Sequence, residues 1–166
     1  MTKLTQRLSE FSRPSSREIE EIDLRKVIEG ALFFASQELK YQNIELRLNL
    51  PNNLPRVKGS RSQFEEIFLN LIVNAYHAMP NGGILTIEGK QVGNSIEISV
   101  SDTGIGIPKS EHKNIFKPFY TTKKKTGTGL GLHIVKTLTE QNCGEIHVKS
   151  ELGKGTMFAI QFFYSI

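Results

Sequence analysis

Two glycine-rich stretches about twenty residues apart constrain the fold of this chain more than any other feature. They read Asp-Thr-Gly-Ile-Gly-Ile at 102–107 and Gly-Thr-Gly-Leu-Gly-Leu at 127–132. Glycine has no Cβ, so backbone N–H groups can approach a ligand closely and left-handed conformations cost little. The second stretch continues into residues 132–138, whose apolar positions recur at helical spacing. A glycine loop that leads into a helix N-terminus is typical of a phosphate site, although such glycines also serve tight turns.

The length and composition indicate one globular domain. A chain of 166 residues with 38% hydrophobic residues can bury a core of ordinary size. The sequence shows no signal-peptide pattern and no apolar run of the roughly 20 residues that span a bilayer. The single cysteine, Cys143, cannot form an internal disulfide. We therefore expect a cytoplasmic location, and a role for Cys143 as a small buried hydrophobe.

The net charge of +4 is concentrated in one segment. Residues 108–126, between the glycine stretches, hold six lysines and a single acid, Glu111. This placement predicts a lid that faces phosphate groups rather than a surface for nucleic acid, with a solvated lysine-rich loop as the alternative. We expect the lid to be mobile until nucleotide binds, with Phe116 and Phe119 anchoring one end and Lys123 contacting phosphate.

The apolar periodicity predicts an α+β two-layer sandwich, in which three helices back one mixed, mostly antiparallel sheet. Asp23 is a good N-cap for the first helix, and Ser60 with Gln63 forms a capping box for the second. The third helix is expected at 129–141, with Gly144 as its C-terminal cap.

The strands are predicted from alternation of apolar and polar residues. A first strand at 44–50 is expected to have one buried face, and two further strands meet in a hairpin turn at Gly93-Asn94. Two final strands are expected at 145–150 and 155–163.

Asp102 carries the sharpest single signal. Alternation places it on the same face of its strand as Ile98 and Val100, which is the apolar face. A buried carboxylate needs hydrogen-bond donors, because unpaired burial is costly. The donors can be the amides of the following glycine loop, or the amino group of a ligand such as adenine N6. Thr156 shares the parity of Phe158, so its hydroxyl is also expected to point inward.

The helix predicted over 61–79 has a polar row beside its apolar face. Glu66, Asn70, Asn74 and His77 recur there at helical spacing. Asparagine lowers helix propensity, so two on one face ask for a reason. One explanation is a solvated face. The other is a metal site, because amide oxygens are hard ligands and Mg²⁺ takes few protein ligands beside water and phosphate.

Other catalytic patterns are missing from the sequence. His112, His133 and His147 have no cysteine or histidine partners at metal-ligand spacing. No Ser-His-Asp arrangement or paired-carboxylate pattern is evident, which argues against a hydrolase.

Four motifs in this order resemble the ATP-binding catalytic domain of bacterial sensor histidine kinases. That domain has the Bergerat fold, which gyrase and mismatch-repair ATPases share, and the resemblance covers about residues 20–163. The F box, Phe-Lys-Pro-Phe-Tyr-Thr-Thr-Lys, is most similar to the nitrogen-regulation branch of the family. The motifs are the N box at 63–79, the first glycine box at 102–106, the F box at 116–123 and the second glycine box at 127–132.

The resemblance implies that the domain binds ATP or ADP with Mg²⁺. Asp102 would bind adenine N6, Asn74 would coordinate Mg²⁺ with support from Asn70, and His77 stands where the family often has a phosphate-binding Lys or Arg. Asn70, Asn74 and Lys123 form the implied catalytic set. The implied nucleotide site comprises Asn74, His77, Ala78, Asp102, Gly104, Gly106, Ile107, Tyr120, Thr122, Lys123, Gly127, Thr128, Gly129, Leu130, Gly131, Leu132 and Thr156.

The resemblance also implies what surrounds this domain. Residues 1–14 resemble the end of the second helix of a dimerisation and phosphotransfer hairpin, 15–22 form a linker, and 23–166 form the catalytic domain. None of the four histidines has the His-Glu/Asp-x-x-x-Pro context of an acceptor. We therefore expect γ-phosphoryl transfer to a histidine on the hairpin domain of the same parent, with a response regulator downstream. The fragment is expected to be monomeric and the parent homodimeric.

Three other functions fit part of the pattern. A self-contained ATPase of the gyrase and chaperone kind, and a serine kinase of the anti-sigma-factor type, characteristically place Glu four residues before the magnesium asparagine. That position is Asn70, which cannot accept a proton at neutral pH. A nucleotide-sensing module without catalysis is the third alternative.

Overall fold

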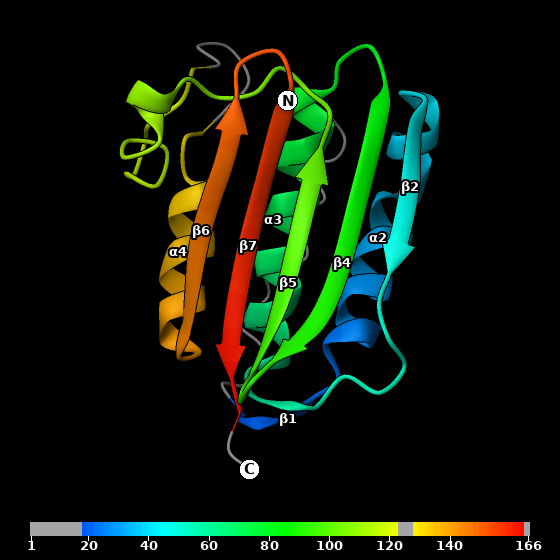
Figure 1. Cartoon of the computed structure of the whole chain (residues 1–166), viewed down its shortest axis with the longest axis vertical. Helices are drawn as coiled ribbons and strands as arrows, with labels where there is room; N and C mark the ends of the chain where they lie inside the picture. Colours follow the sequence, from blue (N-terminus) through cyan, green and yellow to red (C-terminus); the bar gives the residue numbers. More distant parts are fainter. Residues whose placement is uncertain (1–17, 123–127, 165–166) are drawn as a thin grey trace.

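The computed structural model describes residues 18–122 and 128–164, which form two layers. The main sheet has five strands. Figure 1 shows that the α-helices cover one face of this sheet, while the opposite face is open. The expected α+β sandwich is therefore confirmed. The elements are β1 (Glu20–Ile22), α2 (Leu24–Tyr41), β2 (Ile44–Asn49), β3 (Val57–Gly59), α3 (Arg61–Ala78), β4 (Gly83–Val92), β5 (Ser95–Asp102), the 3₁₀ helix η1 (Lys109–Glu111), α4 (Gly131–Gln141), β6 (Gly144–Glu151) and β7 (Gly155–Phe163).

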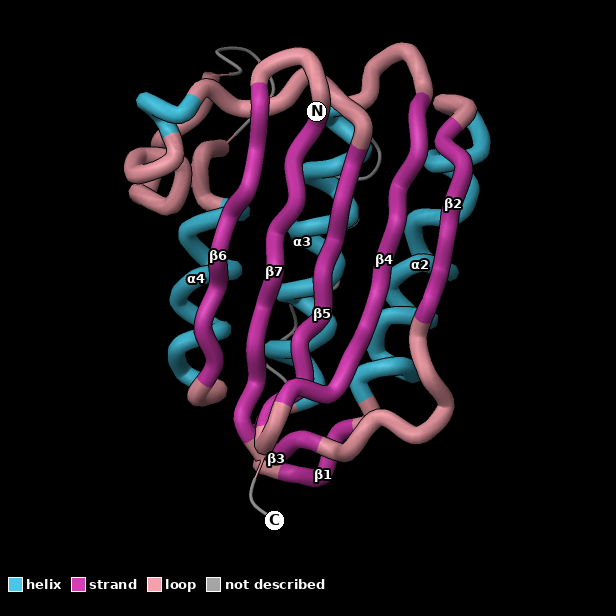
Figure 2. The backbone as a smooth tube through the Cα atoms, viewed as in Figure 1, coloured by secondary structure: helices cyan, strands magenta, loops and turns pink. Residues whose placement is uncertain are grey.

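The main sheet is mixed, as predicted, and Figure 2 shows its strands side by side. Its strand order is β2-β4-β5-β7-β6, in which β2 is parallel to β4 and all other neighbours are antiparallel. The predicted hairpin is present, with Gly93 at a φ of 58° between β4 and β5. Asp102, the last residue of β5, pairs with Leu85 of β4 and with Thr156 of β7. This register places Asp102 at the end of the central strand, between two hydrogen-bonded neighbours.

The apolar faces of the helices pack on one face of the sheet and form the core. Phe64 and Phe68 of α3 and Phe162 of β7 are fully buried. The rings of Phe64 and Phe162 meet edge to face, with centroids 4.9 Å apart. This packing holds α3 against the centre of the sheet. The C-terminal end of α3, with its polar row, lies near the end of β5 that carries Asp102.

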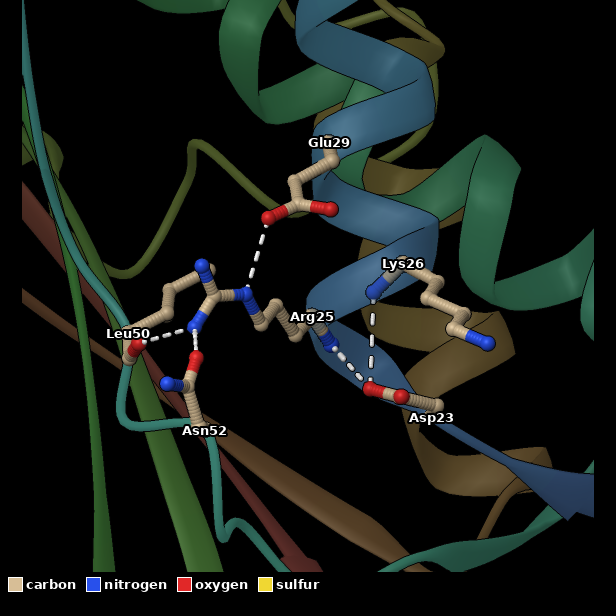
Figure 3. A network of polar contacts seen from close by, with 6 residues as sticks. All are labelled: Asp23, Arg25, Lys26, Glu29, Leu50 and Asn52. Carbon is tan, nitrogen blue, oxygen red and sulfur yellow. Dashed lines mark hydrogen bonds and ion pairs between the residues drawn. The ribbon is translucent and has the colours of Figure 1, made fainter.

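The first helix begins where the sequence predicts. The carboxylate of Asp23 accepts hydrogen bonds from the backbone N–H groups of Arg25 and Lys26 at 3.1 and 3.4 Å (Figure 3). The Arg25 guanidinium then donates to the carbonyl of Leu50 at 3.0 Å and to the side chain of Asn52. These bonds tie the start of α2 to the chain that leaves β2.

The burial predicted for the strand at 44–50 is only partly correct, since Ile44 and Leu50 are buried but Leu46 and Leu48 are not. Leu46 and Leu48 pair with Leu85 and Ile87, which are fully buried, yet they remain 42% and 40% exposed. Only Ile44 within β2 is buried. The reason is position, since β2 is an edge strand and alternation shows which face a residue takes but not whether that face is covered.

The capping box predicted for α3 is also wrong. The Ser60 side chain makes no capping bond to the helix. Asn142, which follows α4, accepts from the Ser60 N–H at 3.3 Å, and its own amide group donates to the Gln63 side chain at 2.8 Å. The end of α4 packs against the start of α3. Asn142, which is distant in sequence, therefore binds the Ser60 N–H in place of Gln63.

The end of α4 departs from the prediction by one residue. Asn142 is the C-cap, and Cys143 takes the left-handed conformation at a φ of 55°, whereas Gly144 already begins β6. A Cβ on Gly144 would lie 2.7 Å from the Phe162 ring, so this glycine serves close packing. Cys143 is exposed, which corrects its expected burial.

A small second sheet lies at the end of the expected linker. β1 pairs antiparallel with β3, and Ile22 of β1 is fully buried. Residues 1–14, expected to be the tail of a hairpin helix, lie outside the described residues. Within the described residues, no helix is long and apolar enough to cross a membrane.

Candidate functional site

The last two turns of α3 carry the asparagines predicted to hold a metal ion. The side-chain amide of Asn70 donates to the Glu66 carbonyl at 2.8 Å, which leaves the Asn70 Oδ1 directed away from the helix backbone. Asn74 is half-buried one turn further on, followed by His77, whose ring lies 5.4 Å from that of Tyr76. Burial raises the pKa of the Glu66 carboxyl, the acid nearest to Asn70 on this row. The described residues contain no group of three His, Cys, Asp or Glu that could hold a metal.

Asp102 is 7% exposed, as its position on the apolar face predicts. Its Oδ1 atom accepts hydrogen bonds from the Gly104 N–H at 2.8 Å and from the Thr156 N–H at 3.3 Å. The first of these bonds comes from an amide of the following glycine loop, which is the structural role that the sequence allows for Asp102. Two bonds from two different segments fix the orientation of the carboxylate at the rim of the sheet.

The first glycine loop is pressed against neighbouring backbone on both sides. A Cβ on Gly104 would lie 2.3 Å from the carbonyl oxygen of Ala78, and one on Gly106 would lie 2.0 Å from that of Glu151. Gly106 also has a φ of 71°. The Ile105 N–H donates to the Ala78 carbonyl at 2.9 Å, so the loop is joined to the end of α3. Glycine is required at both positions by space, and at Gly106 by conformation as well.

Ser150 is a contributor that the sequence reasoning missed. Its hydroxyl accepts from the Ile107 N–H at 2.7 Å, donates to the Gly155 carbonyl at 2.9 Å and lies 2.7 Å from the Thr156 hydroxyl. Thr156 itself is 5% exposed and points inward, as predicted. Ser150 shares strand parity with the apolar Ile146 and Val148, and this signal could have identified it.

The second glycine loop lies against both α3 and the lid segment. A Cβ on Gly129, which has a φ of 70°, would lie 2.4 Å from the backbone of Phe119. A Cβ on Gly131 would lie 3.2 Å from Asn70 Oδ1, so the start of α4 lies against the asparagine row of α3. Thr128 is exposed, Leu130 and Gly131 are half-buried, and Leu132 packs against the core.

The start of α4 has no side-chain cap. A helix leaves the N–H groups of its first turn without intrahelical partners, and its N-terminus carries partial positive charge. The predicted order of glycine loop followed by helix is confirmed, and the uncapped helix end suits an anion.

The described part of the lid is anchored by one phenylalanine rather than two. Phe116 packs against Phe158 at a centroid distance of 6.2 Å, and the His133 ring lies 3.2 Å from the Phe116 carbonyl. Phe119 is 75% exposed with a φ of 63°, which corrects its expected anchoring role. The positive φ turns its side chain away from the core while its backbone meets Gly129.

The remaining predicted lid residues divide into two groups. Tyr120 packs against the core and Thr122 is exposed. Lys123 and Gly127 lie outside the described residues, so their predicted phosphate contacts stay predictions. The structure thus brings the end of α3, both glycine loops, Asp102 and Thr156 to one end of the sheet.

A protein-family model matches most of this sequence. The model described as "Histidine kinase-, DNA gyrase B-, and HSP90-like ATPase" matches residues 59–165, a range that includes both glycine loops and the asparagine row. The chain belongs to this ATPase family.

Individual relatives of this ATPase domain are kinases. The sensor histidine kinase ZraS of Escherichia coli K12 is 32% identical over 160 residues, which cover 96% of this chain and 34% of ZraS. Sporulation kinase C of Bacillus subtilis is 42% identical over 104 residues, which cover 63% of this chain and 24% of that kinase. The chain therefore spans about a third or less of the length of these curated relatives.

Solved structures agree with the fold of the ATPase domain. The catalytic domain of histidine kinase ThkA superposes with a TM-score of 0.80 at 27% identity, covering 90% of this chain and 99% of that domain. The mycobacterial sensor histidine kinase MprB gives a TM-score of 0.78 at 26% identity, covering 91% of this chain and all of the solved chain.

Proposed function

We propose that this domain binds Mg·ATP at the end of the sheet and donates its γ-phosphoryl group to a histidine on a partner domain. The observation that carries the proposal is the convergence of three features. The oriented Asp102 carboxylate, the uncapped start of α4 and the asparagine row of α3 all meet around glycines that exclude a Cβ. Asp102 and Thr156 would bind the adenine end, and Thr128 to Leu132 would bind the phosphates.

The asparagine row suits a magnesium ion held partly by the nucleotide. Asn74 would supply an amide oxygen, and Asn70 would support it from one turn below through Oδ1, which lies near Gly131 at the phosphate end. When bound, Mg²⁺ would neutralise charge on the phosphate groups. The lysines of the lid, including Lys123, would add positive charge at the same end, and His77 would offer a ring nitrogen for a hydrogen bond to phosphate.

The transfer requires mainly positioning. An imidazole nitrogen attacks the γ-phosphorus, a P–N bond forms, and the bond to the β-phosphate oxygen breaks to release ADP. A neutral imidazole is already a nucleophile, so the site does not need a base to activate it. None of the four histidines of this chain has an acceptor context. In line with the family resemblance, we propose that the acceptor lies on a hairpin domain of the parent protein.

The ATPase and serine-kinase alternatives need a proton acceptor close to the magnesium asparagine. Asn70 occupies the position one turn before Asn74. Glu66 lies two turns before Asn74, about 12 Å along the helix axis at 1.5 Å per residue, which is beyond hydrogen-bond reach of the same water. The arrangement therefore favours transfer to histidine over attack by water or serine.

The wider context follows the family resemblance. We propose a homodimeric parent of the nitrogen-regulation type, with this domain in the cytoplasm and a response regulator that takes the phosphoryl group from the acceptor histidine. Relatives named as sensor histidine kinases support this assignment.

Phosphoryl transfer from radiolabelled ATP tests the proposal. The chain would be mixed with the separately produced hairpin domain of its parent and Mg·ATP. We expect label on the hairpin, stable to base and lost in acid, and none on the chain itself. Acid-stable label on the chain would favour the serine kinase, and rapid phosphate release without labelling would favour the self-contained ATPase. Nucleotide binding without transfer or hydrolysis would favour a sensing module.

A further inference from the structure

The sheet has two edge strands, β2 and β6. Among the described residues, β2 is hydrogen-bonded only to β4, so its other side has no partner strand (Figure 1). An open edge strand is a template for pairing with another chain, and proteins usually protect it with charge, proline or a bulge. β2 reads Ile-Glu-Leu-Arg-Leu-Asn and contains no proline.

The direction of the free backbone groups follows from one hydrogen bond. The carbonyl of Asn43 points toward β4, because it accepts from the Gly83 N–H at 3.5 Å. A trans peptide is planar, so the N–H of Ile44 points away from β4. Directions alternate along an extended strand, and the N–H and C=O groups of Ile44, Leu46 and Leu48 therefore face outward.

The side chains of β2 divide into an apolar and a charged face. Leu46 and Leu48 lie on the helical face with the buried Leu85, but are 42% and 40% exposed. Glu45 and Arg47 lie on the open face, where they form an ion pair at 2.7 Å with both side chains 58% exposed.

We propose that β2 pairs with β2 of a second copy, antiparallel, about a two-fold axis through Leu46. Leu46 then faces Leu46 of the second copy, and Ile44 faces Leu48 of the second copy. These are the outward-facing residues, so every free N–H and C=O of the edge gains a partner. On the other face, Glu45 lies opposite Arg47 of the second copy, twice by symmetry. Apolar contact, charge and hydrogen bonding are satisfied in the same register.

The opposite edge, β6, makes a useful rival because its charges also match. A two-fold axis through His147 would place Glu145 opposite Lys149 of a second copy. The difference lies in apolar exposure: Ile146 and Val148 are half-buried and pack against the core. Of the residues that the structure describes, β6 has no large apolar side chain as exposed as those of β2.

The helix α2 also carries exposed apolar side chains. Phe33 and Tyr41 of α2, the helix behind β2 and β4, are 83% and 90% exposed (Figure 1). The Arg25 bonds to Leu50 and Asn52 hold α2 against the end of β2 (Figure 3). The edge strand and the helix behind it are therefore held together by hydrogen bonds.

The proposed dimer is weak, because six residues on each side make a small interface. A dissociation constant on the order of 0.1–1 mM is expected at low salt. The proposal replaces the expectation of a strictly monomeric fragment, and it does not depend on nucleotide binding.

Sedimentation equilibrium of the full chain at low salt, from 10-fold below to several-fold above this range, tests the proposal. The wild type should rise from the monomer mass of 18.7 kDa toward twice that value. Glu45→Arg and Arg47→Glu should each stay monomeric, because each places like charges opposite one another twice. An equimolar mixture of the two variants should associate, and the double variant carrying both changes should recover wild-type association.

Lys149→Glu on β6 is the matched control, with the same charge change as Arg47→Glu at the other edge. It should associate like the wild type. Association that survives both single β2 variants, or that Lys149→Glu alone abolishes, would overturn the proposal, as would a wild type that stays monomeric throughout. Both β2 side chains are exposed, so circular dichroism should show unchanged folding in every variant.

Discussion

The two glycine loops have similar sequences but different surroundings. The first is held by the Asp102 carboxylate, the Ala78 carbonyl and the Ser150 hydroxyl, which belong to a strand, a helix and another strand. In the second, the Leu130 N–H donates to the Thr128 hydroxyl at a long 3.4 Å, and the following helix begins without a side-chain cap. Its closest neighbour across space is the backbone of the exposed Phe119.

The difference indicates that the two ends of the proposed nucleotide site are built differently. The proposed adenine end is part of the sheet, and its backbone and carboxylate are held by hydrogen bonds within the protein. The proposed phosphate end is a helix terminus with groups left for a ligand to satisfy, bordered by a basic lid. We therefore expect binding at the first end to select the nucleotide, and binding at the second end to order the chain.

The largest expected effect is on folding stability when a methyl group is added to each loop. Gly106→Ala should lower the free energy of unfolding by about 3 kcal/mol, because it combines a positive φ with a clash against fixed backbone. Gly129→Ala should cost about 1–2 kcal/mol, because the Phe119 segment can shift. Urea denaturation followed by circular dichroism measures both.

Gly93→Ala is the control for these two variants. It has a φ of 58° but no atom within 4 Å of the added methyl, so it reports the conformational cost alone. Equal losses at Gly106 and Gly129 would contradict the proposed difference between the loops.

A second test separates the ends by their dependence on magnesium. Asn74→Ala should weaken ATP binding about tenfold in the presence of Mg²⁺ and leave it nearly unchanged in EDTA, because only the metal-linked interaction is removed. Isothermal titration calorimetry in both buffers measures the change. An equal loss in both buffers would show that Asn74 does not act through the metal.

A smaller effect is expected from the serine that braces the first loop. Ser150→Ala removes the acceptor of the Ile107 N–H and should lower the free energy of unfolding by about 1 kcal/mol. Ser110→Ala, at an exposed position of η1, is the matched control and should be neutral. Equal melting temperatures of the two variants would show that the hydrogen bond from the Ile107 N–H to Ser150 does not contribute to stability.

The smallest change is expected in backbone protection at the first loop itself. Amide hydrogen exchange at 103, 104, 105 and 107 should hardly respond to Mg·ATP, since these four amides are already bonded, whereas residues 108–122 should become protected. Exchange in the lid that ignores nucleotide would contradict its proposed ordering.

The sequence predicted those features that depend on local alternation. Asp102 and Thr156 were placed correctly because strand parity is a property of neighbouring residues. The exposure of Leu46 could not be predicted, since it depends on which strand forms the edge of the sheet. The Asn142 cap was missed for the same reason, because it bonds to Ser60 across 82 residues of chain.

The positive φ of Phe119 had no counterpart in the sequence pattern either. Glycine, asparagine and aspartate signal such conformations, whereas a phenylalanine does so only through the contacts of its folded surroundings. The site was therefore predictable where glycines and parity define it, and unpredictable where the lid meets the second loop.

The most direct test of the central claim compares ATP with GTP by calorimetry, in the wild type and in Asp102→Ala. The wild type should prefer ATP, because the Asp102 carboxylate accepts from the adenine amino group but not from the guanine carbonyl. Loss of this charge-assisted bond should weaken ATP binding about ten- to a hundred-fold, with a matched unfolding curve to exclude loss of structure. Equal affinity of the wild type for ATP and GTP would contradict the claim that Asp102 selects adenine at a preformed end of the site.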